Sequence, residues 1–292
     1  MNATQPAVPS GLVIVDKESG MTSHQVVGRL RRLLGTRKIG HAGTLDPMAT
    51  GVLILGVNRA TRLLGHLALH DKRYLATVRL GQSSHTDDAD GEVTAVADAS
   101  RLTARELEAA VALLRGVIMQ RPSSVSAIKV DGKRSYARVR SGEDVVLPER
   151  QVTVSALEVL DARPVGSCLD VDIDVECSSG TYIRAIARDL GEELGVGGHL
   201  TALRRTRIGG YSLEDAVTLG EEAPTLMPMA EAARLSFPVV ELTEEEARDV
   251  GYGRPLQRPV PGNPTGVLSP SGELLGLYQP VDDGAKPVAV LV

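Results

Sequence analysis

A single carboxylate, Asp46, stands between two groups of glycines and immediately before an apolar run that is typical of a buried strand. Pro47 disfavours the α region for the residue before it, so Asp46 is expected in an extended or turn conformation. Gly43 and Gly51 permit tight backbone bends and the close approach of another molecule. A carboxylate held in this way is suited to act as a nucleophile or a base. An Asp-Pro turn that leads into a core strand is the alternative, and the spacing alone does not decide between the two.

Few other residue types in the chain suggest chemistry by their spacing. The chain has no Trp, one Phe and six Tyr, so the core must be aliphatic and each tyrosine is a candidate for a special role. Cys168 and Cys177 flank one alternating run, and their odd separation places them on opposite faces of a strand, so we expect two free thiols. No group of His, Cys and acidic residues has the spacing of metal ligands, and we expect neither a metal nor a cofactor.

Several segments resemble the motifs of one enzyme family. The stretch GHAGTLDPMATGVLILG at residues 40–56 resembles the catalytic motif of the TruB family, the tRNA pseudouridine-55 synthases. Residues Gln120 to Tyr136 resemble a further family stretch, Q-x-P-P-x-Y-S-A-x-K-x-x-G-x-R-x-Y, with Ser123 and Val125 in place of the second Pro and the Tyr. Other segments that match family motifs are 11–23, 72–81, 84–91, 177–184 and 199–206. The small C-terminal domain is similar to the family's PUA domain, although its motifs are weak.

The resemblance implies a reaction and four catalytic residues. The reaction is the isomerisation of uridine to pseudouridine at position 55 in the T-loop of tRNAs, by base flipping and an aspartate nucleophile. By position, Asp46 is that aspartate, and its attack on C6 of the base or on C1′ of the ribose stays open. Arg184 is the expected partner that keeps the Asp46 carboxylate ionised and oriented. Tyr74 and Tyr182 are expected to stack on the flipped base, with a further role for Tyr182 in removing the proton at C5.

The same resemblance implies substrate-binding residues. His41 would occupy the space that the flipped base vacates, and Leu203 would form the apolar wall of the pocket. From the concentration of Lys and Arg at 29–38 and 204–207, which includes Arg204 and Arg205, we also expect these residues to meet phosphates of the tRNA T-arm. Each has a plainer alternative: a loop histidine that caps a turn, a core leucine, or a solvated arginine.

The distribution of charge supports a polyanionic substrate more than the total charge does. The chain of 292 residues has a formal net charge of −5. Residues 1–80, however, hold eleven Lys and Arg against four Asp and Glu, whereas residues 211–250 hold two against ten. A basic N-terminal part is compatible with a local face that binds a polyanion.

The sequence suggests neither a membrane span nor a signal peptide. No apolar run reaches about 18 residues, and residues 1–10 lack a basic segment followed by an apolar one. We therefore expect a cytoplasmic protein without membrane contact. We further expect a monomer that acts on tRNA without a protein partner.

Hydrophobic periodicity predicts an α+β protein with a mixed, largely antiparallel sheet and a small C-terminal β-rich domain. We expect a disordered N-terminus at 1–10, a catalytic domain at 11–235 and a PUA-like RNA-binding domain at 236–292, with a linker arm at 216–238 across the boundary between the two domains. Expected strands are 11–17, 52–57, 73–80, 126–130, 152–160, 169–177, 200–206, 267–268, 274–278 and 288–292. Expected helices begin at Thr22 or Ser23, at the capping box Thr103-x-x-Glu106, near Tyr182, and at the capping box Thr243-x-x-Glu246.

Three other functions compete with this interpretation. A non-catalytic RNA-binding or RNA-folding protein would keep the scaffold, but it would not need Asp46, Tyr74, Tyr182 and Arg184 together. A synthase that depends on a guide RNA would carry extensions for which this chain has little room. A hydrolase with Asp46 as nucleophile would need a helper histidine or a metal cluster, and the sequence supports neither.

Overall fold

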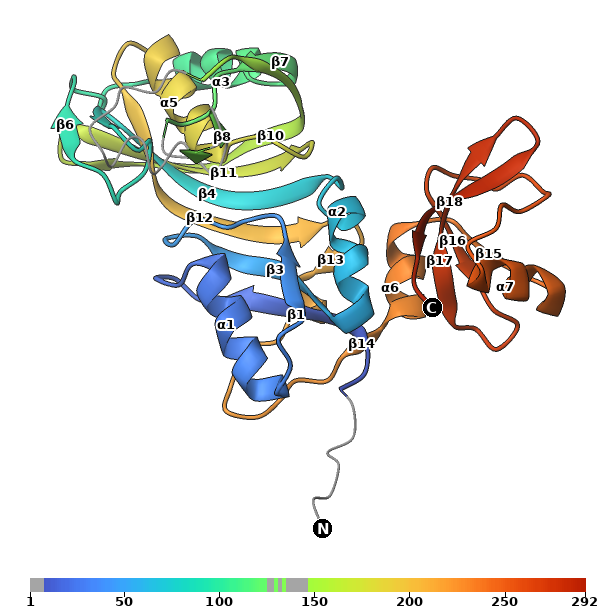
Figure 1. Cartoon of the computed structure of the whole chain (residues 1–292). Helices are drawn as coiled ribbons and strands as arrows, with labels where there is room; N and C mark the ends of the chain where they lie inside the picture. The colour runs from blue at the N-terminus through green and yellow to red at the C-terminus, as the bar shows by residue number, and fades with distance from the viewer. Residues whose placement is uncertain (1–7, 125–128, 131–132, 135–146) are drawn as a thin grey trace. The chain divides into compact units, whose positions relative to one another are not determined.

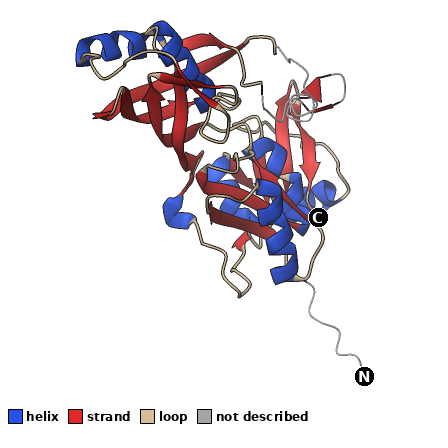
Figure 2. Ribbon diagram, turned by 90° about the vertical axis from the view of Figure 1, so that its left-hand side faces the viewer, coloured by secondary structure: helices blue, strands red, loops and turns tan. Residues whose placement is uncertain are grey.

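The computed structural model describes residues 8–292 apart from 125–128, 131–132 and 135–146 (Figure 1). The chain divides into two compact units, the first made of Met1–His70 and Arg207–Val292 and the second of Asp71–Thr206. Both contain helices and strands, which Figure 2 distinguishes by colour. With most strand pairs antiparallel, the protein is α+β, which confirms the expected fold class.

The first unit is built on the strands that carry the Asp46 loop. Strand β1 (Gly11–Lys17) pairs antiparallel with β3 (Thr50–Val57), and β2 (Ile39–Ala42) also pairs with β3. Helix α1 (Ser23–Leu34) follows β1; Thr22 caps it in a capping box, and Gly35 ends it in the left-handed region. Short elements η1 (Asn58–Arg62) and α2 (Leu64–Leu67) follow β3. The chain segment 43–49 therefore connects two adjacent strands of one sheet.

The C-terminal part of this unit forms a four-stranded sheet in the order β15-β16-β17-β18. Its core includes Val250, Val267 and Tyr278. The expected boundary at residue 236 lies inside this first unit. From residue 211 onwards the elements are β13 (Tyr211–Ser212), η2 (Leu213–Asp215), β14 (Met227–Pro228), α6 (Met229–Ser236), β15 (Val239–Glu241), α7 (Glu244–Gly251), β16 (Thr265–Leu268), β17 (Leu274–Val281) and β18 (Gly284–Val290).

The expected linker arm at 216–238 is not irregular throughout, because it contains β14 and helix α6. Pro228 is the N-cap of α6, with an extended backbone, so this proline begins a helix instead of excluding one. Two alanines of α6, Ala232 and Ala233, are buried in the core of the first unit together with Phe237. The short apolar face of α6 is therefore what attaches this segment to the rest of the unit.

The second unit is a sheet in the order β12-β4-β11-β10-β7 with two helices on one face (Figure 1). Helix α5 (Ile183–Glu193) packs on β4, and α3 (Ala104–Leu113) packs on β10 and on α5. The long strands are β4 (Lys72–Leu80), β10 (Arg150–Val165), β11 (Cys168–Cys177) and β12 (Gly198–Ile208); the shorter ones are β5 (Gln82–Ser84), β6 (Val93–Ala95), β7 (Gly116–Gln120), β8 (Lys129–Val130) and β9 (Lys133–Arg134).

Strand β4 has one buried face, which carries the candidate residue Tyr74, and one face that is partly exposed to solvent. Lys72, Tyr74 and alternate residues after them are buried, whereas Arg73 and Leu75 face the other way and are exposed. On that outer face, Arg73 pairs with Asp174 of β11 at 2.7 Å. The acidic residues of β11 are thus partly neutralised by neighbouring cations, and the candidate Tyr74 lies on the buried face.

Most of the predicted long elements are present, with longer bounds than the sequence suggested. The predicted strand 152–160 is part of β10, and 200–206 is part of β12. Of the predicted strand 126–130, residues 126–128 lie outside the described part of the chain and Lys129–Val130 form β8. The sequence did not predict β2 or β7, which are short. Among the described residues, no helix is long and apolar enough to cross a membrane.

Candidate active site

Asp46 lies in the loop between β2 and β3, where the glycines perform the role that their positions suggested. Gly43 and Gly51 adopt φ angles of +73° and +99°, in the region that strains other residues. The Asp46 side chain is half-buried, between the buried residues Leu45 and Ala49. The Ala49 N–H donates to the Asp46 carbonyl at 3.1 Å, which closes a turn around Pro47.

A buried lysine fixes the backbone directly after Asp46. Lys17, at the end of β1, is only 1% exposed, and its ammonium donates to the carbonyls of Glu18, Met21 and Pro47 at 3.0, 2.7 and 3.2 Å. The Gly20 N–H also donates to the Pro47 carbonyl, at 2.9 Å. The turn after β1 is therefore tied to the Asp46 loop by charge-assisted and backbone hydrogen bonds.

Ser23, in the first turn of α1, fixes the backbone on the other side of Asp46. Its hydroxyl accepts from the Leu45 N–H at 2.9 Å and is 3.1 Å from the Leu45 carbonyl, to which it donates. Ser19 adds a donor to the Met48 carbonyl at 3.2 Å. His41 belongs to the same unit, on β2 opposite Leu55 and half-buried.

The other three candidate catalytic residues lie in the second unit. Tyr74 is on β4 opposite Val175 and is 6% exposed. Tyr182 is the N-cap of α5 and Arg184 is in its first turn, so the start of this helix sets both side chains.

Arg184 is held by the turn that follows β5. The guanidinium is 4% exposed, and its Nη1 donates to the Thr86 carbonyl at 2.8 Å and to the Ser123 hydroxyl at 3.3 Å. The same nitrogen lies 3.4 Å from Asp88 Oδ2. Ser123, one of the two departures from the family motif, thus contacts a candidate catalytic residue. Val125, the other departure, lies outside the described residues, and the pairing of Arg184 with Asp46 stays a prediction.

Hydrogen bonds within the turn at residues 84–91 fix the Thr86 carbonyl and the Asp88 carboxylate that contact Arg184. Asp88 Oδ1 accepts from the Thr86 hydroxyl at 2.6 Å, and a Cβ on Gly91 would lie 2.3 Å from that hydroxyl, so any other residue there would displace it. Asp87 next to it pairs with Arg188 of α5 at 3.2 Å. Burial raises the pKa of Asp87, while Arg188 opposes the rise. Sequence reasoning recorded this turn as a resemblance and missed that it holds Arg184.

Two residues that the sequence did not single out hold Tyr182. The side-chain amide of Gln120 donates to the Tyr182 carbonyl at 3.1 Å and accepts from the Tyr182 N–H at 2.8 Å. The Arg150 guanidinium lies 4.8 Å from the centre of the Tyr182 ring and donates to the Gly180 carbonyl. The ring and the backbone of this tyrosine are therefore both fixed.

The two arginines of β12 face opposite sides of the sheet, as neighbours on a strand do. Arg205 is 1% exposed and Arg204 is half-buried, while Leu203 is buried on the same face as Arg205. The burial of Arg205 argues against a phosphate contact at the surface. Lys72 is buried nearby: burial, and then the charge of Arg205, lowers its pKa to about 8. The roles proposed for Leu203 and Arg204 stay predictions.

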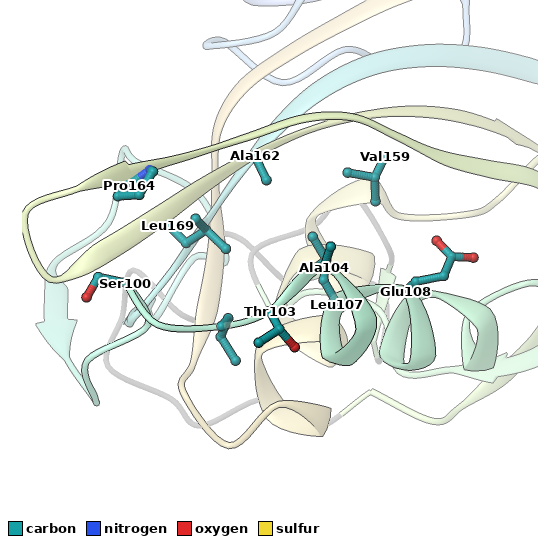
Figure 3. Close-up of a pocket in the computed structure, with 10 residues that line it drawn as sticks. Ser100, Thr103, Ala104, Leu107, Glu108, Val159, Ala162, Pro164 and Leu169 are labelled. Carbon is teal, nitrogen blue, oxygen red and sulfur yellow. The ribbon is translucent and has the colours of Figure 1, made fainter.

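The hollows in the described surface include one that is open and basic and one that is largely apolar. The open one of about 590 Å³ at the end of α1 is lined by Arg31, Arg32, Gly35, Thr36 and Arg37, within the basic segment predicted to meet phosphates. The largely apolar one of about 470 Å³ lies between α3 and the strands β10 and β11 (Figure 3) and contains none of the predicted site residues. Among the described residues, no group of three or more His, Cys, Asp or Glu is placed to hold a metal ion. Cys168 and Cys177 are free and buried, as expected.

Comparison with known proteins identifies the family of the chain. Residues 31–183 match the family model "TruB family pseudouridylate synthase (N terminal domain)", 184–230 match "tRNA pseudouridylate synthase B C-terminal domain", and 237–292 match "tRNA Pseudouridine synthase II, C terminal". The chain is 58% identical to tRNA pseudouridine synthase B of Cutibacterium acnes, over 97% of this chain and 98% of the relative. It is 56% identical to the enzyme of the same name from Streptomyces griseus, over 98% of each.

Solved structures share the fold at lower identity. An H/ACA ribonucleoprotein bound to a substrate RNA containing 2′-deoxyuridine contains a chain that is 23% identical, with a TM-score of 0.72 over 97% of this chain and 85% of the other. A Cbf5-Nop10-Gar1 complex contains one that is 25% identical, with the same TM-score and coverage. The chain belongs to the TruB family of tRNA pseudouridine synthases, isomerases that convert uridine to pseudouridine in tRNA.

Proposed function

We propose that this enzyme modifies the uridine at position 55 in the T-loop of tRNAs, with Asp46 as its nucleophile. The observation that carries the proposal is the loop around Asp46. Lys17 and Ser23 bind its backbone on both sides, while the half-buried carboxylate comes between them. Such fixation suits a group that must meet one atom of a bound nucleotide.

The reaction is balanced without an oxidant or a reductant. The N1–C1′ bond breaks, the base rotates, and a C5–C1′ bond forms; C5 loses a proton and N1 gains one. A carboxylate that adds to C6 or to C1′ and later leaves is sufficient for both steps. Arg184 stabilises the negative charge that Asp46 carries before the attack and after it leaves.

Tyr74 and Tyr182 hold the base after it leaves the T-loop stack. A uridine in a folded loop is reached only once it is extruded, and enzymes hold extruded bases between aromatic or apolar side chains. Tyr182 also takes part in removing the C5 proton. Leu203 forms the apolar wall of this pocket, and His41 fills the space that the base leaves.

The T-arm backbone binds to the basic hollow at the end of α1 and to Arg204. Arg32 and Arg37 there are exposed, so their charges are accessible to phosphates. We further propose that the enzyme acts as a monomer without a protein partner. The substrate, tRNA, supports a cytoplasmic location.

The test is to incubate the purified chain with unmodified tRNA and to map pseudouridine by position. Pseudouridine at position 55 alone supports the proposal, and pseudouridine at another position with uridine left at 55 contradicts it. Asp46→Asn distinguishes an enzyme with this nucleophile from a protein that only binds or folds tRNA, because it leaves the binding surface in place.

A further inference from the structure

Gln120 has an unusual environment for an uncharged polar side chain. It is the last residue of β7, and its exposed fraction is 0%. Its amide nitrogen donates to the Tyr182 carbonyl at 3.1 Å, and its amide oxygen accepts from the Tyr182 N–H at 2.8 Å. Because a carbonyl only accepts and an N–H only donates, these two partners also determine which end of the amide is oxygen.

The sheet does not need this side chain. The backbone of Gln120 is already paired with Arg150 in the ladder between β7 and β10. An amide that is buried without partners costs free energy, so burial here is tolerated because both ends are bonded. The amide acts on Tyr182 as the backbone of a neighbouring strand would.

Tyr182 lacks the support that a helix N-cap usually has. It makes no side-chain capping bond, and its backbone is extended, with φ −101° and ψ 111°, before α5 begins. Gln120 therefore supplies one hydrogen bond to each backbone group of Tyr182, and the Tyr182 carbonyl also accepts from the Ile186 N–H of α5 at 3.2 Å. Arg150, the ladder partner of Gln120, lies over the Tyr182 ring at 4.8 Å. One position along the β7–β10 pair thus holds both the backbone and the ring.

We propose that Gln120 is a positioning residue, which fixes the Tyr182 ring for catalysis by binding its backbone at two points. This inference rests on the proposed role of Tyr182 in holding the flipped base and removing the C5 proton. Gln120 acts through Tyr182 alone and touches no substrate atom.

The first measurement is the steady-state rate of pseudouridine formation by Gln120→Ala. We expect kcat to fall about 10- to 100-fold, the scale of a small misplacement of a catalytic group, with KM for tRNA changed less than about threefold. The matched control is Gln151→Ala, which makes the same truncation on an exposed side chain of β10. It should retain the kcat of the wild type.

A second variant covers the case in which Gln120→Ala does not fold. Gln120→Glu keeps the shape, and its protonated carboxyl offers one donor and one acceptor, as the amide does. Burial raises the pKa of that carboxyl, so the two hydrogen bonds to the Tyr182 backbone persist at low pH. The bond to the Tyr182 carbonyl is lost as the group ionises. We expect the ratio of its kcat to that of the wild type to fall as pH rises. A ratio that does not change with pH would overturn the proposal.

The final comparison separates this inference from the proposal about Tyr182. If Gln120 acts through Tyr182, Gln120→Ala should cost kcat much less in a Tyr182→Phe background than in the wild type. Full additivity of the two changes, or a Gln120→Ala enzyme with kcat within about twofold of the wild type, would overturn the positioning role. A Tyr182→Phe enzyme with wild-type kcat would instead contradict the role of Tyr182, and with it the basis of this inference.

Discussion

Arg184 and Asp88 form a buried ion pair, with Arg184 Nη1 3.4 Å from Asp88 Oδ2 and the two side chains 4% and 6% exposed. A carboxylate outside the Asp46 loop therefore helps to place the guanidinium that is expected to serve Asp46. A buried guanidinium with a fixed neighbour cannot move freely between partners. If Arg184 serves Asp46 as expected, we expect catalysis to depend on Asp88 as well, although no sequence motif assigned it a chemical role.

Asp88→Ala should lower both stability and activity. Removing one partner of a buried pair leaves an uncompensated charge, and such changes cost about 3–5 kcal/mol of unfolding free energy. Chemical denaturation measures this loss, and kcat should fall with it because Arg184 loses a support. The control is Asp174→Ala, which breaks the pair between Asp174 of β11 and the half-exposed Arg73 of β4, on the outer face of the sheet in the second unit. A loss no larger than that of the control would show that the Asp88 pair is not important.

Asp46→Asn should abolish isomerisation and leave tRNA affinity within a few-fold of the wild type. The substitution removes the nucleophile but hardly changes the surface, and the backbone bonds from Lys17 and Ser23 are unaffected. Single-turnover assays and filter binding measure the two quantities. Turnover above a few per cent of the wild type would contradict the assignment of Asp46.

Ser23→Ala should lower kcat through the Asp46 loop. It leaves the buried N–H and carbonyl of Leu45 without this partner, which costs about 1–3 kcal/mol for each unsatisfied group. Thermal unfolding and kcat are both measured. Ser19→Ala is the control, because its bond to the Met48 carbonyl is exposed and should cost little. Equal effects of the two variants on kcat would contradict a special role for Ser23.

Local patterns predicted the elements, and contacts between distant residues explain what the sequence did not reveal. Helix α1 was predicted because Thr22 or Ser23 can cap a helix and apolar residues follow at helical spacing. The structure shows that Thr22 is the N-cap and that it forms a capping box with Gln25. The contact of Gln120 with Tyr182 joins residues 62 positions apart, and no local signal indicates it.

Arg204 and Arg205 show a second reason why the sequence did not reveal the whole site. The motif identified both as phosphate contacts, yet strand alternation places one of two neighbours inside, and here it is Arg205. The sequence predicts that neighbouring side chains on a strand face opposite sides of the sheet, but which of the two faces is buried depends on how β12 packs. The resemblance pointed to both positions, whereas their burial is known only from the structure.

Lys72 should make stability rise with pH in a definite window. Its pKa falls from 10.5 to about 8 on folding, because burial disfavours the ammonium. Between these values the unfolded chain binds more protons, so the folding contribution of this group becomes more favourable as pH rises from about 8 to 10.5. Burial raises the pKa of Cys177 from 9.0 to about 11, which acts in the opposite direction.

The comparison of the wild type with Lys72→Met isolates the lysine from that opposing thiol. The difference in unfolding free energy, wild type minus variant, should increase between about pH 8 and 10.5 and be constant below 8. Urea unfolding at a series of pH values measures it. A constant difference over the whole range would show that Lys72 is not desolvated in the folded protein.

Replacing Arg32 and Arg37 together by Ala should weaken tRNA binding and make it less sensitive to salt. The variant makes two fewer phosphate contacts, so its binding to tRNA releases fewer counterions. The slope of log K against log salt should therefore flatten by about one to two units. Arg101→Ala with Arg105→Ala is the matched control, since both arginines are exposed but lie by helix α3. Tyr74→Ala should cut catalysis by about 1–3 kcal/mol through lost stacking and leave the slope unchanged. An unchanged slope in the Arg32 and Arg37 variant would mean that the hollow at the end of α1 is solvated surface, and the T-arm phosphates would then have to be bound by other residues.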